Sequence, residues 1–399
     1  MRLAALALGV LLTAAATPAA HGGEVGRVGL GQSIGSPVAD PTGGAWTTTW
    51  RTGESAYVTR YDSGRPARRA IVKGMVRDLV VGPDGLAWAT ADGNRLVRSD
   101  REGRITVAAE LPEQRFFEGG LAFGPDGAAW SSTAVWAGDQ PATELVRTTT
   151  NGVVTFSPFP LPACKRSRIT GIATASDGAL WFADDGCSRL VRRGVDGALT
   201  VTPLGTLTPA KLVPDQAGGV WFFSQGVVGH SGGARHPIED VTDIALMPDG
   251  TVWAADGSCT LQRIGGTPVP APLAVGSLAA GGGDLWLAGG TRLFKGLDGG
   301  PCDDTGPKVT IRPKRPTLDQ IRRGELRITV REPAALEFYF EEPEFGYGKI
   351  LRKAGTWRVQ PSRAALRYLR SKRQFYFVLN ATDANGIEGG TDGYITLKR

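Results

Sequence analysis

The chain has 399 residues and a formal net charge of +6, and 41% of its residues are hydrophobic. This length excludes one small core and suits one large β domain followed by a small one. Its 56 glycines fall at turn positions and not in low-complexity tracts, so they indicate repeated hairpins.

Residues 1–20 predict a secretory signal peptide. Arg2 precedes an apolar run from Leu3 to Leu12, and small residues around Ala19 and Ala20 offer a cleavage site. The run is too short to span a membrane, and no other stretch approaches that length. We therefore expect a secreted protein, with association to the cell envelope as a further option. The four cysteines fit an oxidising compartment.

A repeated phrase that ends in tryptophan fills residues 24–300. It consists of an apolar strand, a Gly-containing turn and the Trp, as in LVVGPDGLAW and IATASDGALW. The seven tryptophans are Trp46, Trp88, Trp130, Trp181, Trp221, Trp253 and Trp286. Four short strands in roughly 40 residues are typical of one propeller blade. The sequence therefore predicts an all-β, seven-bladed β-propeller, with each Trp packed between neighbouring blades.

The two ends of the repeat region predict how the ring closes. The last repeat stops at Gly296, after its third strand, and has no obvious fourth. The strand-like segment EVGRVGLGQ, residues 24–32, precedes the first repeat. We expect this segment to supply the missing outer strand, which would also remove an exposed sheet edge.

Residues 301–307 are predicted to be a linker, and residues 308–399 a small immunoglobulin- or fibronectin-like β-sandwich with one short helix. The chain from Thr305 onward carries a net charge of +9, against −3 for the remainder. The densest basic cluster is Arg363, Arg367, Arg370, Lys372 and Arg373. This charge favours either contact with an anionic cell-envelope surface or a solvated face that aids solubility. No nucleic-acid partner is expected, because the protein is predicted to be exported and the helix shows no repeated pattern of interleaved aromatic residues.

The cysteines predict two disulfides. Cys187 and Cys259 each follow a blade tryptophan by six residues, which places both on one face of the disc. Cys164 lies just before the inner strand of the fourth blade, on the same face, so a Cys164–Cys187 bond is geometrically sensible. Cys259 then pairs with Cys302 by elimination.

Candidate ligand-binding residues lie where the inner strands begin, around the central funnel. They are Arg77, Asp78, Thr170, Lys211, Thr242 and Asp243. Their mixed charge suits a small polar ligand or a protein loop, or else ordered water and satisfied ion pairs. Asp184 and Asp256 are candidate ligands for Mg²⁺ or Ca²⁺, although no spacing motif supports a metal site. No catalytic Ser-His-Asp set can be assembled at the centre, and no cofactor is expected.

The repeat GIATASDGALWFADDGCSRLVRRGVDGALT closely resembles repeats of the virginiamycin B lyase (streptogramin lyase) family, over roughly residues 25 to 300. The resemblance implies a bacterial seven-bladed propeller and a Mg²⁺-assisted elimination on a cyclic depsipeptide. The family expects a His before the inner strand in its last two blades, where this chain has Thr242 and Gly276. The family's acidic positions correspond to Ala274 or Val275, and to Gly289 or Gly290. We therefore expect no lyase activity, since the proton-abstracting base and the metal ligands are absent.

Three functions stay open at this point. The first is a non-catalytic, secreted propeller that binds something at its funnel. The alternative is a metal-dependent lyase or lactonase of the virginiamycin B lyase type, a C–O lyase, with a rearranged site. That alternative needs at least three carboxylate or His ligands at one point in the funnel. The third is a structural envelope protein with an inert funnel.

Overall fold

The computed structural model describes residues 23–28, 32–51, 56–62, 65–72, 74–100, 102–137, 140–159, 164, 167–298, 302, 305–340, 342–351, 353–383 and 388–398. The predicted signal peptide lies outside these residues. Within them, no helix is long and apolar enough to cross a membrane.

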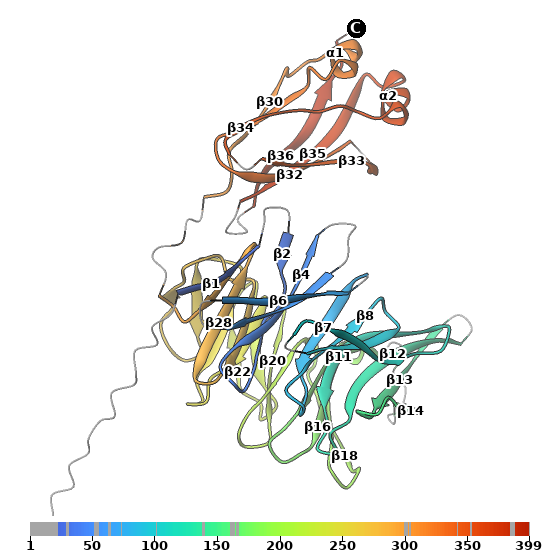
Figure 1. Ribbon diagram of the computed structural model, residues 1–399, viewed down its shortest axis with the longest axis vertical. Coiled ribbons are helices and arrows are strands. Elements are labelled where there is room, and N and C mark those ends of the chain that lie inside the picture. Colours follow the sequence, from blue (N-terminus) through green and yellow to red (C-terminus); the bar gives the residue numbers. More distant parts are fainter. Residues whose placement is uncertain are drawn as a thin grey trace, which may run out of the picture.

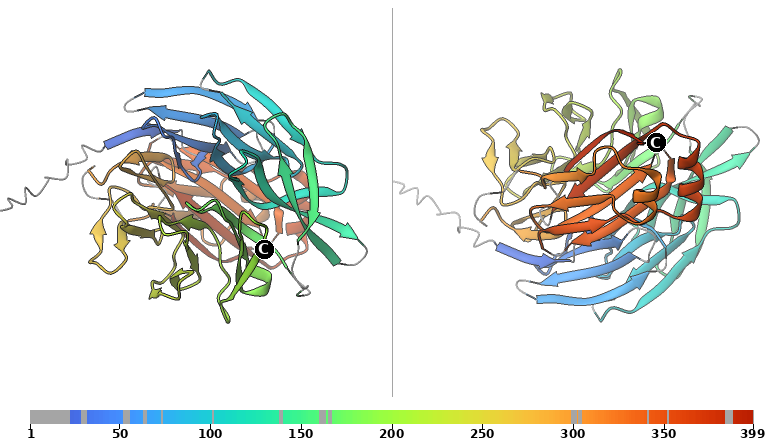
Figure 2. Two further views of the ribbon diagram at one scale, coloured as in Figure 1. Left: turned by 90° about the horizontal axis from the view of Figure 1, so that it is seen from below. Right: turned by 90° about the horizontal axis from the view of Figure 1, so that it is seen from above.

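Over the described residues, seven antiparallel sheets follow one another around a common centre (Figures 1 and 2). The first comprises β2 (Gln32–Ile34), β3 (Val38–Ala39), β4 (Ala45–Arg51), β5 (Ala56–Asp62) and β6 (Arg65–Val72). The second comprises β7 (Val76–Val81), β8 (Ala87–Ala91), β9 (Arg95–Ser99) and β10 (Ile105–Glu110). The third comprises β11 (Arg115–Phe123), β12 (Ala129–Ala137), β13 (Gln140–Thr148) and β14 (Val154–Pro158).

The remaining blades repeat this pattern. The fourth comprises β15 (Ile169–Thr174), β16 (Leu180–Asp184), the 3-10 turn η1 (Asp185–Cys187), β17 (Arg189–Arg193) and β18 (Leu199–Pro203). The fifth comprises β19 (Leu212–Pro214), β20 (Val220–Ser224), β21 (Val227–His230) and β22 (Arg235–Pro237). The sixth comprises β23 (Asp243–Leu246), β24 (Val252–Ala255), β25 (Thr260–Arg263) and β26 (Val269–Pro270). The seventh comprises β27 (Ser277–Gly281), β28 (Asp284–Gly289), β29 (Arg292–Lys295) and β1 (Gly23–Arg27). The predicted seven-bladed propeller is confirmed.

The ring closes with the N-terminal strand, as the sequence predicted. Strand β1 pairs antiparallel with β29, with Gly23 opposite Lys295 and Arg27 opposite Arg292. The Glu24 carboxylate accepts hydrogen bonds from Arg27 Nε at 2.6 Å and from Arg292 Nε at 2.9 Å. The outer edge of the last blade is therefore covered by a segment from the other end of the propeller.

Seven apolar clusters among the described residues join consecutive blades, and each contains one repeat tryptophan. Trp46 lies between the first and second blades, for example, and Trp286 packs with Ile34 and Tyr61 across the closing interface. The others occupy the clusters in between: Trp88, Trp130, Trp181, Trp221 and Trp253. Trp46, Trp88 and Trp286 are fully buried. Burial of this large apolar surface between blades is what holds the ring together.

The Asp-Gly turn fixes the strand geometry around each full phrase. Gly85 has a φ of +73°, a left-handed conformation that glycine adopts without steric cost. The preceding Asp84 accepts hydrogen bonds from Leu86 N at 3.0 Å and from Trp88 Nε1 at 3.2 Å. The same carboxylate thus holds the turn and orients the tryptophan.

The C-terminal region has a core of its own. One sheet has the strand order β30 (Val309–Arg312), β31 (Arg327–Val330) and β34 (Gly355–Arg358). The other has the order β33 (Glu342–Leu351), β32 (Ala334–Phe340), β35 (Gln374–Thr382) and β36 (Glu388–Thr396). Both sheets share one apolar cluster with Ile321 of helix α1 (Leu318–Arg322) and Leu369 of helix α2 (Arg363–Arg370). The predicted short helix corresponds to α2, whereas the immunoglobulin- or fibronectin-like fold stays a prediction.

Candidate functional site

A cavity of about 710 Å³ lies at the centre of the propeller. All seven blades contribute to its wall, mainly through the apolar side chains of inner strands such as Leu79, Ile172 and Ile244. Polar side chains gather where the inner strands begin: Ser36, Arg77, Asp78, Thr170 and Lys211. The cavity therefore has apolar walls and one polar mouth of mixed charge.

Three inner strands carry bulges near their start, and two of them place polar side chains at this mouth. The register of β7 shifts between Val76 and Leu79, and that of β15 shifts between Ile169 and Gly171. Strand β11 carries two similar shifts. A bulge turns its side chains away from simple alternation. Arg77, Asp78 and Thr170 sit within these irregular steps, and all three line the cavity.

Lys211 and Asp243 form a clamp between blades, in which Asp243 is buried and Lys211 is partly exposed on the cavity. Lys211 Nζ lies 2.7 Å from Asp243 Oδ1 and donates to the carbonyl oxygen of Leu278 at 3.0 Å. The Asp243 carboxylate also accepts from Ile244 N at 2.8 Å and from Leu278 N at 2.9 Å. Asp243 is 3% exposed, so both of its oxygens are engaged inside the wall. Neither Asp243 nor the exposed Thr242 belongs to the cavity lining.

Asp78 is the half-buried carboxyl of the mouth. It accepts a hydrogen bond from Thr90 Oγ1 at 3.3 Å. Burial raises the pKa of Asp78, and this effect outweighs the opposing influence of Thr90, the Gly120 N–H and Arg77. Arg77 is exposed on the cavity, and no carboxylate in the described part of the chain forms a salt bridge with it. Its guanidinium is the unpaired positive charge at the mouth.

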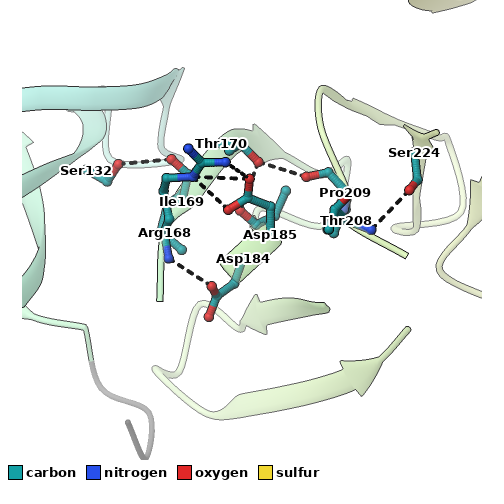
Figure 3. Close-up of polar contacts among 10 residues, drawn as sticks. Ser132, Arg168, Ile169, Thr170, Asp184, Asp185, Thr208, Pro209 and Ser224 are labelled. Atoms are coloured by element: carbon teal, nitrogen blue, oxygen red, sulfur yellow. Dashed lines mark hydrogen bonds and ion pairs between the residues drawn. The ribbon is translucent and has the colours of Figure 1, made fainter. Parts of the chain in front are cut away.

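Thr170 uses its hydroxyl to join two blades (Figure 3). Thr170 Oγ1 donates to the carbonyl oxygen of Pro209 at 2.8 Å. In the preceding pair of blades, Ser132 Oγ lies 3.4 Å from the carbonyl oxygen of Ile169, while its shorter hydrogen bond, at 3.0 Å, goes to the carbonyl oxygen of Gly119 in its own blade. The Thr170 hydroxyl proton is therefore committed to the scaffold, which leaves its oxygen as an acceptor.

The predicted metal candidates do not converge. Asp184 is fully buried, and it accepts from Ser167 Oγ at 3.0 Å, Arg168 N at 3.0 Å and Arg189 Nε at 2.9 Å. The neighbouring carboxylate of Asp185 pairs with the Arg168 guanidinium (Figure 3). On the far blade, Asp256 accepts from Ser258 N at 2.9 Å.

The donor set does not fit Mg²⁺. Over the described residues, the one group with ligand spacing is Cys164, Asp184 and Cys187, and its two cysteines are joined to each other. At the positions that the family resemblance indicates, Ala274 and Val275 are buried apolar residues. A side chain at Gly289 would place its Cβ 1.9 Å from the carbonyl oxygen of Ala274. Tight packing occupies the space that a carboxylate at Gly289 would need, so the residues present at these positions do not fit a metal.

Both predicted disulfides are confirmed. Cys164 pairs with Cys187 at a Cα–Cα distance of 6.0 Å, and Cys259 pairs with Cys302 at 5.6 Å. The first lies within the fourth blade, beside Asp184. The second ties the sixth blade to the segment that precedes β30.

Sequence reasoning missed the Asp215 partner of His230 and left the environment of Glu118 open. His230 Nε2 lies 2.7 Å from Asp215 Oδ2, and His230 Nδ1 accepts from Gly232 N at 3.0 Å. Both ring nitrogens are engaged, so this pair stabilises the fifth blade and leaves no free base. Glu118 has a buried Oε2 without a hydrogen-bond partner, and burial raises its pKa. The turn sequence DQAGG before Trp221 was the available signal for Asp215, whereas alignment of the repeats on their tryptophans already places Glu118 beside the funnel positions.

The model of the virginiamycin B lyase family matches residues 38–264. Among solved structures, a streptogramin B lyase is 19% identical with a TM-score of 0.55, over 69% of this chain and 96% of that one. A virginiamycin B lyase from Staphylococcus aureus is 17% identical with a TM-score of 0.56, over 69% and 98%. A catalytically inactive virginiamycin B lyase from the same organism, with quinupristin, is 17% identical with a TM-score of 0.53, over 69% and 98%. No curated protein matches the sequence. At these identities the structural likeness shows the propeller fold alone.

Proposed function

Because the chain belongs to the virginiamycin B lyase family, we propose that it is a secreted propeller that binds a small ligand in its central cavity and lacks lyase activity. The two disulfides support secretion, since such bonds persist in oxidising compartments. The division into a propeller at 24–300 and a basic unit at 308–399 is part of the proposal. It is supported by the separate apolar core of the C-terminal strands.

The main support for the absence of lyase activity is that the acidic residues near the funnel already form ion pairs with basic side chains. Asp243 pairs with Lys211, and Asp184 pairs with Arg189. An elimination needs a base that is free to take a proton, and a metal needs at least three free oxygen or nitrogen donors. Thr242 and Gly276, where the family has histidines, provide no such base. The alternative lyase or lactonase would require the clamp around Asp243 to open.

The cavity itself supports a more specific ligand than the polar one first expected. A volume of about 710 Å³ suits a small molecule. The apolar walls favour a ligand with an apolar body, and the unpaired Arg77 favours one anionic group at the mouth. A carboxylate is a good match because guanidinium binds it through two parallel hydrogen bonds. Asp78, with its raised pKa, opposes this anion least when it is protonated.

Incubation of the secreted form with quinupristin and Mg²⁺ tests the missing activity. We expect the lactone ring to stay intact by mass spectrometry, whereas a lyase of this family run in parallel should open it. Turnover that depends on Mg²⁺ and survives repurification would overturn the non-catalytic proposal and favour the rearranged metal site.

Thermal-shift titration with decanoate and with decanol tests the binding site. We expect decanoate to raise the melting temperature by mass action, and Arg77→Gln to weaken its affinity by roughly tenfold or more, the scale of a lost charged hydrogen bond. Arg104→Gln, on an exposed turn of the same blade, is the matched control. Equal weakening in both variants would exclude Arg77 as the anion site. No shift with either probe would favour an inert funnel.

A further inference from the structure

The outward face of the β30–β31–β34 sheet carries a row of arginines. Arg312 lies directly opposite Arg327, and Arg327 lies directly opposite Arg358. All three side chains are exposed. The alternate residues Ile311, Ile328 and Trp357 point inward and pack in the C-terminal core. The strand register therefore places the three arginines at neighbouring positions on one face of the sheet.

A row of threonines runs beside the arginines on the same face. Thr310 pairs with Thr329, and Thr329 pairs with Thr356, with 2.9 Å between the hydroxyl oxygens of the latter two. Lys308 and Arg331, at the next alternating positions, are exposed as well. We call the six residues Arg312, Arg327, Arg358, Thr310, Thr329 and Thr356 the Arg-Thr face.

Folding alone does not account for this arrangement. Like charges directly opposite each other in a sheet destabilise it. In the described parts of the chain no salt bridge joins the three guanidinium groups to a carboxylate. The nearby Glu325 is paired with Arg323 at 2.7 Å, which lowers the pKa of Glu325, and the more distant charge of Arg327 adds only a minor contribution. The positive charge of the row is thus available to a partner.

We propose that the Arg-Thr face binds an acidic polysaccharide, independently of the ligand in the propeller cavity. Neighbouring strands are about 4.8 Å apart, and successive rows on one face are roughly 7 Å apart. The face therefore offers regularly spaced guanidinium groups for sugar carboxylates, and hydroxyl groups for the neutral oxygens of the sugar. A glycan chain that carries both kinds of group matches both rows.

The chemistry of the face favours a glycan over other polyanions. In the described C-terminal residues the only large hydrophobic side chain that is strongly exposed is Tyr394, on β36 of the other sheet. The Arg-Thr face thus has no apolar residue to insert into a membrane and no aromatic ring for nucleobases to stack on. A row of threonines adds nothing to adsorption on fluid lipid headgroups, whereas it matches a ligand rich in hydroxyl groups.

Calorimetric titration of the full secreted chain with polygalacturonate tests this proposal, with neutral dextran as the blank. We expect the parent chain to bind polygalacturonate, and this binding to weaken with added salt. The triple variant Arg312→Gln, Arg327→Gln, Arg358→Gln should lose about tenfold or more in affinity, because it loses charged hydrogen bonds to the ligand. The matched control removes three exposed arginines of helix α2, Arg363, Arg367 and Arg370, by the same change. It should lose less than about threefold.

Two further measurements complete the test. The variant Thr310→Val, Thr329→Val, Thr356→Val keeps the charge and the β-branched shape, and we expect it to bind polygalacturonate more weakly. The triple Gln variant should melt no lower than the parent, because it relieves repulsion between like charges. If both triple arginine variants lost affinity for polygalacturonate equally, the binding would depend on net charge alone, and the proposal would be wrong. The proposal would also be wrong if the parent chain did not bind polygalacturonate, or if it bound phosphatidylglycerol vesicles or duplex DNA more tightly.

Discussion

At the scale of single residues, position in the fold decides what each carboxylate does. Asp78 and Asp243 both lie at the start of inner strands, yet one lines the cavity and the other is sealed by Lys211. The sequence identified both as polar funnel residues. It did not separate them, because the partners of Asp243 lie 32 and 35 residues away and no local pattern specifies such contacts.

The raised pKa of Asp78 predicts how stability depends on pH. Burial raises the folded-state pKa above the unfolded one, so the folded state binds more protons between the two values. Stability therefore falls as pH rises through this window and stays lower above it. Asp78→Asn removes the penalty. We expect the variant to melt above the parent at neutral pH and level with it in strong acid, by calorimetry across pH.

Asp249→Asn is the control of opposite sign. The hydrogen bond from Thr251 N lowers the pKa of Asp249 in an exposed turn, which stabilises the fold above the unfolded pKa and is lost as pH falls. This variant should melt at or below the parent at neutral pH. A neutral-pH decrease for Asp78→Asn would contradict the account of its burial.

At the scale of elements, strand β1 closes the ring, whereas the bulged inner strands shape the mouth of the cavity. Strand β1 completes the last blade, and its role followed from a simple count of strands in the sequence. The bulges of β7, β11 and β15 had no such signal, since a bulge is defined by the pairing of two strands and no local residue pattern marks these three. These bulges bring Arg77 and Thr170 to the cavity. The sequence therefore predicted which residues lie near the mouth but not the strand irregularities that orient them.

Deletion of residues 1–28 tests the closing strand. We expect the free energy of unfolding to fall by about 1.5–3 kcal/mol from the lost burial of Val28 alone, and the exposed edge of β29 to promote association. Chemical denaturation and size-exclusion chromatography measure the two effects. Deletion of residues 1–22 is the control and should behave as the parent. A stable monomer that lacks β1 would show that the ring does not need this strand.

At the scale of the whole molecule, seven interfaces of one kind build the propeller, and a disulfide links it to a second core. Each interface contains one tryptophan, so the ring repeats a single packing solution. The Cys259–Cys302 bond closes a loop of sequence that includes strands β27 to β29 of the seventh blade, and it ends just before the C-terminal strands. The basic strands are thereby attached to the propeller at a defined point.

Removal of that bond tests its contribution. In the chain-entropy model a loop of 43 residues contributes about 4 kcal/mol. We expect Cys259→Ser, Cys302→Ser to lose roughly 2–4 kcal/mol of unfolding free energy and to be cut faster between residues 298 and 305 under limited proteolysis. The Cys164→Ser, Cys187→Ser variant should lose stability without faster cleavage there. Unchanged cleavage in the first variant would show that the link does not restrain the linker.

The sequence by itself determined the propeller, its closing strand and both disulfides. The reason is that tryptophan spacing, Asp-Gly turns and cysteine positions are local signals, repeated often enough to fix the register of every blade. Only the tertiary structure decided which acids are free, which cation faces the cavity and where three arginines line up. Those facts depend on contacts between distant segments, such as Lys211 with Asp243 or Arg312 with Arg327 and Arg358. Burial and strand register create such contacts only once the chain has folded.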